Sequence, residues 1–553
     1  MAGPGTYWHT LRHLRPVQIY GRALQRLRPR RVDLRPAPAV RQTQGGRWVQ
    51  PARRDPSMLG PSTLRFLNQT ENIGAGGWDN PALERLWRYN AHYFDDLNAA
   101  DARSRHEWHE ALMRRWVAEN PPTRGSGWEP YPTSLRIVNW IKWSLTGNQL
   151  SPESVQSLAV QTRWLASHLE VHLLGNHLLA NAKALVFAGS FLAGDEAERW
   201  LDTGLRLLEQ EIPEQILLDG GHFERSTMYH ALALEDVLDL YNLAAKFSDV
   251  VPKLVEQQLA WRARVGPMRE WLAAMSHPDG DIAFFNDAAF GISASPRELD
   301  DYASSLGLGP RAAIVKRITQ LPDSGYVRVQ DDRSVAILDV GPVGPEYLPA
   351  HAHADTLAFE LSLYGQRVLV NSGTSLYGLG AERERQRGTA AHNTVVIDGE
   401  NSSEVWAGFR VARRARPLNL AIGQNHPTVI ECSHDGYDRL SGSPRHTRKW
   451  VATDGGLDVE DRISGNFRHA EARFHLHPEI QVEDTTLESS GEVVAVLRLP
   501  QDQRVRMKFG AGSVKQEQST WHPQFGASVP NICLVHEFSG PVALTRISWG
   551  RSA

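Results

Sequence analysis

The hydrophobic repeat of this 553-residue chain changes once, near residue 322. From about residue 80 to 321, apolar residues recur every three or four positions, as in "TSLRIVNWIKWSLTG" and "LLANAKALVFAGSFLAG". Short breaks rich in Gly, Pro, Asp and Ser separate these segments. Successive helices of this length predict paired helical hairpins, arranged as a bundle or as a toroid.

After the change, the pattern is typical of strands. Val, Ile, Leu and Phe alternate with other residues in "SVAILDVG" and "EVVAVLRL", and "LYGQRVLV" is typical of a hairpin that turns at Gly365. We therefore expect an α+β multidomain chain. Its parts are a basic N-terminal extension (residues 1–79), a helical domain (80–321) and an antiparallel β-sandwich or stacked-sheet domain (322–553).

The composition is that of a globular protein with a sizeable core, with 41% hydrophobic and 22% charged residues. The net charge of −3 argues against nucleic-acid binding through bulk charge. Two cysteines, Cys432 and Cys533, exclude a disulfide framework but leave one bridge open. The sequence shows no apolar run of about 18 residues and no signal peptide, so we expect a cytoplasmic protein, with the periplasm as the alternative.

The first segment, "MAGPGTYWHTLRHLRPVQIYGRALQRLRPRRVDLRP", combines arginines with a single acid, Asp33. Trp8, Leu11, Leu14 and Leu24 give it an apolar component. Such a basic amphipathic segment can lie on a membrane surface or on a partner. We expect instead that it packs on the body of the protein.

The stretch "HAHADTLAFEL" (351–361) places His351, His353 and Asp355 in alternation, ahead of an apolar run. A strand points alternate residues to one side, so we expect a strand that carries the polar trio at its rim. The alternative is a loop whose three polar residues merely precede the strand.

Two further motifs lie where helices begin. In "GNHLLAN", Asn176 could cap the helix, or Asn176 and His177 could face an acidic ligand at its N-terminus. In "DGGHFERSTMYH", His222 and Glu224 precede a helix, and Tyr229 falls off its apolar stripe. A tyrosine there can face a cleft or be buried against a backbone group.

The stretch "RERQRGTAAHNTVVIDG" brings three arginines before His392. Arginines such as Arg387 suit carboxylate or sulfate groups, although a solvated charge run is the alternative. His353 and His392 could share a metal or could be hydrogen-bonded core histidines.

Taken together and in this order, these stretches resemble the heparinase II/III-like polysaccharide lyases, a family whose relatives include heparin, chondroitin and alginate lyases. The likeness covers most of the chain and also includes "LWRYNAHYFDDL", "GWEPYPTSLRIVNW" and "AAHNTVVIDGENSSEVW". It implies an incomplete (α/α) toroid followed by antiparallel β-sheets, with the active cleft between them.

The resemblance also implies a reaction, β-elimination at a 4-linked uronic acid. The C5 proton is only weakly acidic, so the charge that develops on the carboxylate needs a donor, which would be Asn176 helped by His177. Tyr229 and His351 would supply the base for C5 and the acid for the departing O4, with Tyr229 as the acid. The implied partner is an acidic polysaccharide, a bacterial exopolysaccharide among the candidates, and no organic cofactor is expected.

The resemblance places a structural metal, zinc first, at positions that match His353, Asn371 and His392. The family has an aspartate where this chain has Asn371, and a neutral amide is a poorer zinc ligand. Candidate substrate contacts in the groove are Trp128, Tyr131, Arg136, His222, Glu224 and Arg387.

Three other functions compete with the lyase. A uronyl C5-epimerase would share the first step and return a proton to the opposite face. A glycoside hydrolase would need a carboxylate pair, for which Glu129, Glu224 and Asp287 are available. A non-catalytic glycan-binding protein would need no acid–base pair.

Overall fold

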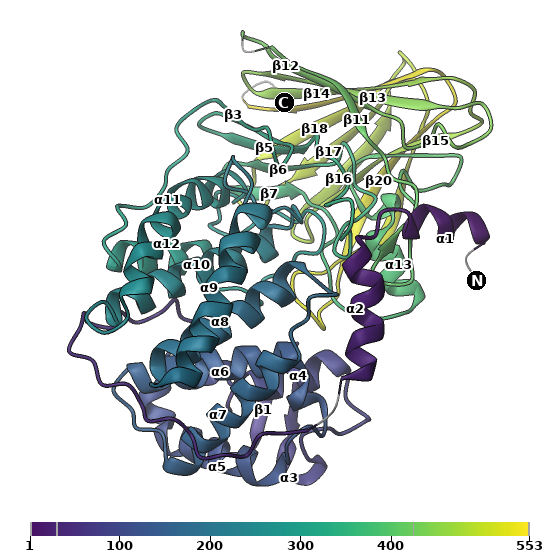
Figure 1. Cartoon of the computed structure of the whole chain (residues 1–553). Coiled ribbons are helices and arrows are strands. Elements are labelled where there is room, and N and C mark those ends of the chain that lie inside the picture. The colour runs from purple at the N-terminus through teal and green to yellow at the C-terminus, as the bar shows by residue number, and fades with distance from the viewer. Residues whose placement is uncertain (1–2, 29–30, 424, 551–553) are drawn as a thin grey trace.

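The computed structural model describes residues 3–28, 31–423 and 425–550, and it shows the predicted helical part followed by a β part (Figure 1). The fold class is therefore confirmed. The first strand of the main β part begins at Ile318, ahead of the predicted boundary at residue 322.

The helical part is built from helices that pack on their neighbours along the chain. These are α3 (Ile73–Gly76), α4 (Arg85–Tyr93), α5 (His106–Glu119), α6 (Pro130–Leu145), α7 (Pro152–Ser167), α8 (Gly175–Phe191), α9 (Asp195–Gln215), α10 (Thr227–Lys246), α11 (Pro252–Ala274) and α12 (Pro296–Ser305). The helix α8 packs on α6 and α9, and α10 packs on α11. The core of this part contains fully buried tryptophans, among them Trp87, Trp116 and Trp140.

Local sequence explains where several of these helices begin. Ser151, Ser226 and Ser295 are the N-caps of α7, α10 and α12, and each side chain accepts a hydrogen bond from a backbone N–H of the first turn. Ser226 matters for the site, because its hydroxyl accepts from the backbone N–H of Tyr229 at 3.1 Å and so fixes that residue in the first turn of α10.

The β part contains a five-stranded, an eight-stranded and a four-stranded antiparallel sheet. The first has the order β3 (Ile318–Leu321), β4 (Tyr326–Gln330), β5 (Ser334–Asp339), β6 (Phe359–Leu363) and β7 (Gln366–Leu369). The second has the order β11 (Pro417–Gly423), β12 (Thr428–His434), β13 (Arg445–Thr453), β14 (Gly456–Ser464), β21 (Val542–Trp549), β18 (Arg504–Phe509), β17 (Val493–Arg498) and β16 (Gln481–Leu487). The third has the order β19 (Ser513–Trp521), β20 (Val529–Phe538), β15 (Ala470–His475) and β8 (Val395–Ile397).

Small elements complete the fold. They are the hairpins β1 (Thr63–Phe66) with β2 (Gln69–Asn72) and β9 (Val405–Trp406) with β10 (Arg410–Val411), the helix α13 (Ala381–Arg387), and 3-10 turns at Asp95–Asn98, Ala102–Arg105, Ser126–Trp128 and Thr389–Ala391. The hairpin predicted at Gly365 is confirmed between β6 and β7, with a φ of 82° at that glycine.

The expectation of one continuous strand in "HAHADTLAFEL" is wrong. The strand β6 begins only at Phe359, and Leu357 has a left-handed backbone with a φ of 62°. The segment before it is held by side chains, because Asn286 Oδ1 accepts from His353 N at 3.1 Å and Asp355 Oδ2 accepts from Asn286 N at 3.1 Å. Buried polar partners replace the ladder of a sheet here.

Two N-terminal helices, α1 (Pro4–Leu11) and α2 (Pro16–Leu27), lie outside the two parts, and the following chain runs extended along the helical part (Figure 1). Cys432 and Cys533 are both buried and free, so the one bridge that the sequence left open does not form. Among the described residues, no helix has the length and apolar character needed to cross a bilayer.

Candidate active site

A cavity of about 1050 Å³ has walls from both parts of the chain. Side chains of α4, α6, α8 and α10 form one side. His351, Tyr377 and Phe409 contribute from the β part. The resemblance puts the active cleft between the same two parts.

The N-terminus of α8 presents Asn176 and His177 to this cavity. The N-cap is Leu174, which has a φ of 61°, so the reading of Asn176 as the N-cap is wrong. Asn176 lies within the first turn, next to backbone N–H groups that have no partner inside the helix and that favour an anion. This is a suitable place for the carboxylate of a uronic acid.

His177 is held by two contacts that set its orientation and its charge. Its Nδ1 lies 3.2 Å from Glu170 Oε1, and its ring packs on Tyr131 with centroids 4.6 Å apart. Burial alone would lower the pKa of His177, but the Glu170 carboxylate outweighs burial and raises the pKa. A protonated His177 can donate to an anion beside Asn176.

Tyr229 lines the cavity from the first turn of α10. Its hydroxyl lies 2.9 Å from the hydroxyl of Tyr377, and its ring lies 4.0 Å from the ring of His351, centroid to centroid. Burial and the neighbouring Tyr377 raise the pKa of Tyr229 well above its ordinary value of 10. The phenol therefore keeps its proton at neutral pH and can donate it to a leaving group.

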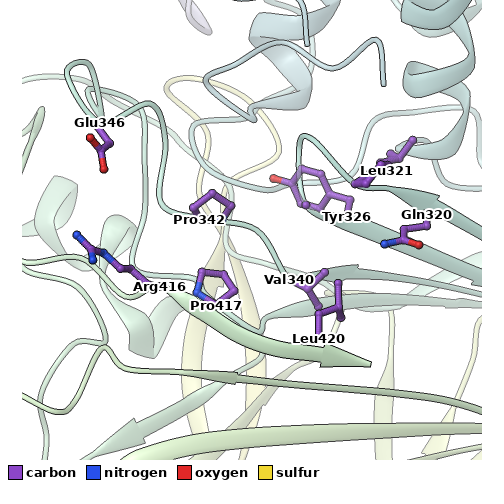
Figure 2. A pocket seen from close by; sticks show the side chains of 11 residues that line it. Gln320, Leu321, Tyr326, Val340, Pro342, Glu346, Arg416, Pro417 and Leu420 are labelled. Carbon is purple, nitrogen blue, oxygen red and sulfur yellow. The ribbon is translucent and has the colours of Figure 1, made fainter. Parts of the chain in front are cut away.

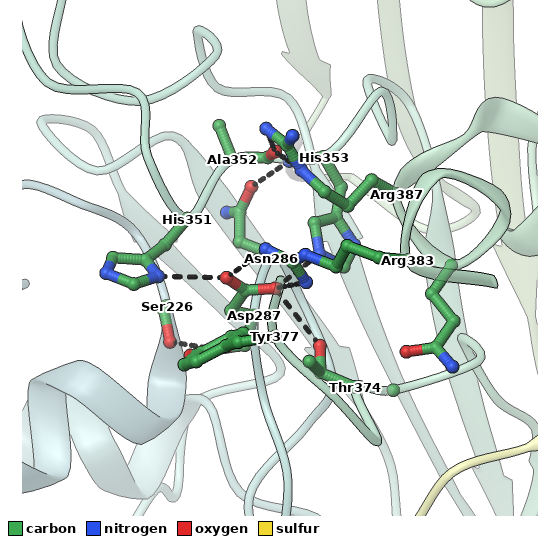
Figure 3. A network of polar contacts seen from close by, with 12 residues as sticks. Ser226, Asn286, Asp287, His351, Ala352, His353, Thr374, Tyr377, Arg383 and Arg387 are labelled. Carbon is green, nitrogen blue, oxygen red and sulfur yellow. Dashed lines mark hydrogen bonds and ion pairs between the residues drawn. The ribbon is translucent and has the colours of Figure 1, made fainter. Parts of the chain in front are cut away.

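Asp287 orients His351 (Figure 3). His351 Nδ1 lies 2.8 Å from Asp287 Oδ2, and the backbone N–H of Asp287 donates to His351 O at 3.0 Å. An ionised carboxylate can only accept, so Nδ1 carries the proton and Nε2 is left as the basic nitrogen. This is the tautomer that a general base needs.

Asp287 also binds three other side chains. Arg383 donates to both carboxylate oxygens, His353 Nε2 lies 2.9 Å from Oδ1, and Thr374 Oγ1 donates to Oδ1 at 3.2 Å. Burial alone would raise the pKa of Asp287, but the buried Arg383 guanidinium outweighs it and holds the pKa well below the ordinary value of 3.8. The carboxylate is therefore a permanent anion at the base of the site.

Glu224 and His222 are two buried titratable residues near His351. Glu224 is 2% exposed, its oxygens have no hydrogen-bond partner among the described residues, and Oε2 lies 3.6 Å from His351 Nε2. Burial raises the pKa of Glu224. Burial, with the nearby His230, lowers the pKa of His222 to about 3, so this histidine is neutral.

A buried ionic network lines part of the cavity. Lys142 Nζ and Lys183 Nζ lie 2.9 and 2.6 Å from the same oxygen of Asp239, and Lys183 also lies 2.7 Å from Asp236. Tyr302 donates to the other oxygen of Asp239 at 3.0 Å. These charges are matched among themselves, so the network serves as a rigid wall.

Four of the six predicted substrate contacts do not line the cavity. Trp128 is 4% exposed and donates to Asn120 O, while Arg136 is fully buried and donates to Gly127 O at 2.8 Å. Arg387 is also fully buried and donates to Ala352 O at 2.8 Å. Each of these side chains donates to backbone carbonyls and so holds the walls together. Glu224 is buried and does not line the cavity either, whereas Tyr131 and His222 do.

The sequence reading missed Arg383, Tyr377 and the role of Asp287. Arg383 stands one helical turn before Arg387 on α13, and the spacing did not show which of the two faces the site. Tyr377 lies in the stretch "NSGTSLYG" (residues 371–378), but a single tyrosine after a turn carries no signal of its own. Asp287 had a local signal, because an acid within "FFNDAAFG" interrupts an apolar run.

The zinc site that the resemblance implies does not fit the residues present. His353 Nδ1 and His392 Nε2 face each other at 3.3 Å, and burial lowers their pKa values to about 4 and about 3. Asn371 is turned to the backbone, because its Nδ2 donates to Phe284 O at 2.8 Å and its Oδ1 accepts from Asn393 N at 3.2 Å. Zinc needs three or four ligands, and two imidazoles with an occupied neutral amide do not supply them.

Within the described ranges, one group of three side chains could hold a metal ion, and it lies elsewhere. His469, Glu471 and Glu537 sit together on β15 and β20 and the chain before them. Arg473 and Lys515 already pair with the two carboxylates, at 2.5 and 2.7 Å. We assign no metal there.

Chelation tests whether His353 and His392 bind zinc or only each other. We expect that treatment with EDTA leaves the Tm unchanged and that purified protein contains well under one zinc per chain, because a structural zinc would contribute directly to folding. Asn371→Asp, which restores a carboxylate, is the matched variant and is expected to gain zinc. One tightly held zinc per chain, with a fall in Tm on chelation, would contradict this reading.

A second hollow of about 360 Å³ lies against β3, β4 and the start of β11 (Figure 2). Its polar side chains include Gln320, Glu346 and Arg416. It contains none of the acid–base candidates, so we assign no activity to it.

Comparison with known proteins shows which family the chain belongs to. A family model described as heparinase II/III N-terminus matches residues 85–306, and one described as heparinase II/III-like, C-terminal matches residues 313–550. A crystal structure of heparinase III has a TM-score of 0.63 at 18% sequence identity, with 83% of this chain and 75% of that chain covered, which shows the fold.

Two curated relatives differ in what they are named for. A heparin-sulfate lyase of Bacteroides stercoris is 25% identical over 429 residues, which cover 66% of this chain and 62% of the lyase. FtsZ-localized protein C of Caulobacter vibrioides is 27% identical over 350 residues, which cover 59% of this chain and 57% of that protein. The match thus spans less than two thirds of either relative. Both family models match in order and together take in most of the sequence, and the chain therefore belongs to the heparinase II/III-like family.

Proposed function

We propose that this chain is a polysaccharide lyase that cleaves a 4-linked uronic-acid polysaccharide by β-elimination. The observation that carries the proposal is that Asn176, His177, Tyr229 and His351 all line one cavity. These residues come from the starts of two helices and from a loop far away in the sequence, so only the tertiary structure brings them together. The lyase relatives support the same reaction class.

The proposal gives each of these residues a step in the reaction. The uronate carboxylate binds at the start of α8, where Asn176 and protonated His177 donate to it and stabilise the charge that builds up as C5 loses its proton. His351 Nε2, the ring nitrogen without a proton, takes the proton from C5. Tyr229 gives a proton to O4 as the C4–O4 bond breaks.

The electrons of the C5–H bond become the C4–C5 double bond, and the electrons of the C4–O4 bond leave with the oxygen. The products are a 4,5-unsaturated uronate at one new end and a free hydroxyl on the other sugar. No water or cofactor is consumed.

The unsaturated product absorbs in the ultraviolet, which supplies the test. The protein would be incubated with heparan sulfate, chondroitin, alginate and unsulfated glucuronans, and the ultraviolet absorbance of the product would be recorded over time. A rise that depends on Tyr229 and His351 is expected. Deuterium exchange at C5 without a rise in absorbance would instead indicate an epimerase. If no uronate polymer gave either a rise in absorbance or exchange at C5, the proposal would be wrong.

The charges on the cavity wall bear on the substrate. Its lining holds more carboxylates than basic groups. The acids are Asp55, Glu84, Asp95, Glu129, Glu170, Glu235, Asp236 and Asp239, and the bases are Arg54, Arg65, Arg85, Lys142 and Lys183. A densely sulfated chain would be repelled by such a wall. We therefore expect the highest turnover on a polymer whose only charge is the uronate.

Asn176 gives a graded test of carboxylate stabilisation. Removal of one preorganised donor costs on the order of 10² to 10³ in kcat, and this loss is expected for Asn176→Ala. Asn176→Asp keeps the size but places a negative charge beside the uronate, so its kcat/KM should fall further. Full activity in Asn176→Asp, measured by the same absorbance assay, would show that the carboxylate binds elsewhere.

A second candidate is a binding role without turnover, because one relative of similar identity is named for its localisation with FtsZ. The assembled acid–base set favours the lyase over this candidate. Glycan binding that is unchanged by Tyr229→Phe and His351→Gln, with no product from any uronate, would favour the binding role.

A further inference from the structure

The N-terminal helices leave a concentrated apolar surface exposed. Among the described residues, 18 large hydrophobic side chains are exposed, and eight of them lie in the first 34 positions. They are Tyr7, Trp8, Leu11, Ile19, Tyr20, Leu24, Leu27 and Leu34. Single exposed apolar residues are ordinary on a protein surface, whereas a contiguous group marks an interaction site.

The apolar residues of α2 form one face. At about 100° per residue, Ile19, Tyr20, Leu24 and Leu27 fall within a sector of roughly 140°. Ile19 is 61% exposed and Leu27 is 79% exposed. The apolar face of α2 therefore points away from the protein.

The opposite side of α2 is fastened to the body by polar and small residues. Gln18 is 3% exposed and donates to Tyr347 O at 3.1 Å. A Cβ on Gly21 would lie 2.8 Å from His172 Cβ, so the helix lies directly on the chain that leads into α8. An ordinary surface helix buries its apolar side, whereas α2 partly buries only Val17 among its large apolar side chains and exposes the others.

The short helix α1 has the same arrangement. Thr10 is buried and accepts from Trp406 Nε1 at 3.1 Å, while Trp8 is 66% exposed and Leu11 is 47% exposed. Both helices thus expose apolar and aromatic side chains, and we call the exposed residues of Tyr7–Leu34 the N-terminal face.

The N-terminal face is strongly basic. Four exposed arginines with described side chains belong to it, namely Arg12, Arg15, Arg22 and Arg31, and the one acid of the segment, Asp33, is partly buried and pairs with Arg35. In the part of the chain that the structure describes, Arg12, Arg22 and Arg31 form no ion pair. Free basic charge next to an apolar stripe favours an occupant that is both anionic and apolar.

We infer that the N-terminal face binds the headgroup region of an anionic lipid bilayer. An apolar helix face flanked by arginines is the pattern of an interfacial helix, and Trp and Tyr favour the boundary between water and acyl chains. A second copy of the chain would bring arginines against arginines. A polysaccharide would use the arginines and aromatic rings but gives Ile19, Leu24 and Leu27 nothing apolar to contact.

The inference revises the expectation that this segment only packs on the body, since one side of each helix packs and the other side is free. It does not depend on the reaction proposed above. Because α2 rests on Tyr347 and His172, close to the segments of His351 and Asn176, a bound bilayer would lie near one rim of the cavity.

Co-sedimentation with vesicles tests the inference on the full chain. Vesicles of phosphatidylcholine with about 30% phosphatidylglycerol carry the charge of an anionic leaflet, and pure phosphatidylcholine vesicles are the neutral comparison. Wild type is expected to bind the anionic vesicles, to bind the neutral ones at least about tenfold more weakly, and to release as salt rises.

Two sets of variants separate the apolar and the basic contributions. Ile19→Asp with Leu24→Asp should weaken binding by at least about tenfold, since both side chains would enter the bilayer. Arg12→Gln, Arg22→Gln and Arg31→Gln together should weaken it on the order of 100-fold, at about fivefold for each basic residue. The matched control is Leu218→Asp with Leu259→Asp, which alters two exposed leucines outside the N-terminal face and should leave binding unchanged.

Each other outcome overturns the inference. Absence of binding to anionic vesicles would do so, and so would binding that the apolar variant retains while its Tm stays at the wild-type value. A dimer in solution that the apolar variant dissolves, without vesicle binding, would assign the face to a second copy. Loss of polysaccharide binding in the arginine variant, without vesicle binding, would assign it to the substrate.

Discussion

Tyr229→Phe is expected to lower kcat by on the order of 10³-fold or more while the protein stays folded. The change removes one oxygen, whose proton is held by burial and by Tyr377 until the leaving O4 can accept it. General acid–base catalysis by one side chain is worth about 10² to 10⁴, and no other described hydroxyl except that of Tyr377 lies beside Tyr229 in the cavity. The rate of formation of the unsaturated uronate measures the effect.

Two tyrosines serve as controls for Tyr229→Phe. Tyr377→Phe removes the hydroxyl that bonds to Tyr229 and should cost about tenfold, since it perturbs the donor without removing it. Tyr437→Phe removes a buried hydroxyl that donates to Val395 O at 2.7 Å in the β part, and should lower stability by about 1 kcal/mol with no change in kcat. Equal activity in wild type and Tyr229→Phe would move the acid to another residue.

The architecture and the helix-borne site residues could be predicted because both depend on local sequence. The change of period near residue 322 separates helices from strands, and "GNHLLAN" and "GGHFERSTMYH" place Asn176 and Tyr229 at helix starts whatever the rest of the chain does. The functional meaning of these positions came from the resemblance, since an asparagine or a tyrosine in a first turn is also common without a function.

The sequence-based predictions were wrong where contacts between residues far apart in the sequence decide which way a side chain points. Trp128 and Arg136 sit in a motif beside Tyr131, but the helix turns them inward to bond backbone carbonyls. Likewise, the arginine run before His392 could not show that Arg383 meets Asp287, which is 96 positions away in sequence. The amphipathic pattern of α2 was visible, but only the structure showed that the helix points its apolar side outward.

Asp287→Asn should also have a large effect, because it should lower both the stability of the protein and its kcat. Arg383 is fully buried, and Asp287 is its one carboxylate partner among the described residues, so the neutral variant leaves an uncompensated charge that costs about 3–5 kcal/mol. The amide can also turn its NH₂ toward His351 Nδ1 and so favour the wrong tautomer. Loss of such an orienting carboxylate behind a catalytic histidine lowers kcat by on the order of 10³- to 10⁴-fold.

Asp300→Asn separates the two effects, because Asp300 pairs with the buried Arg269 at 2.6 Å away from the cavity. Asp300→Asn should therefore lower the stability of the protein, as Asp287→Asn does, but leave kcat unchanged. If Asp287→Asn lost stability but kept its activity, Asp287 would be a structural anchor only, and His351 would need another group to set its tautomer.

The pH dependence of stability gives a second readout for Asp287 that is independent of substrate. Its pKa in the folded protein lies well below the value of about 3.8 in the unfolded chain, so its contribution is fully present above about pH 4 and is lost as the pH falls toward the folded pKa. The difference in unfolding free energy between wild type and Asp287→Asn should therefore be constant from neutral pH down to about pH 5, and shrink below about pH 4. A difference that stays the same in acid would mean that the carboxylate already carries a proton in the folded protein. In that case the donors that converge on Asp287 could not all be satisfied by it, and the assignment of a basic Nε2 to His351 would fall with it.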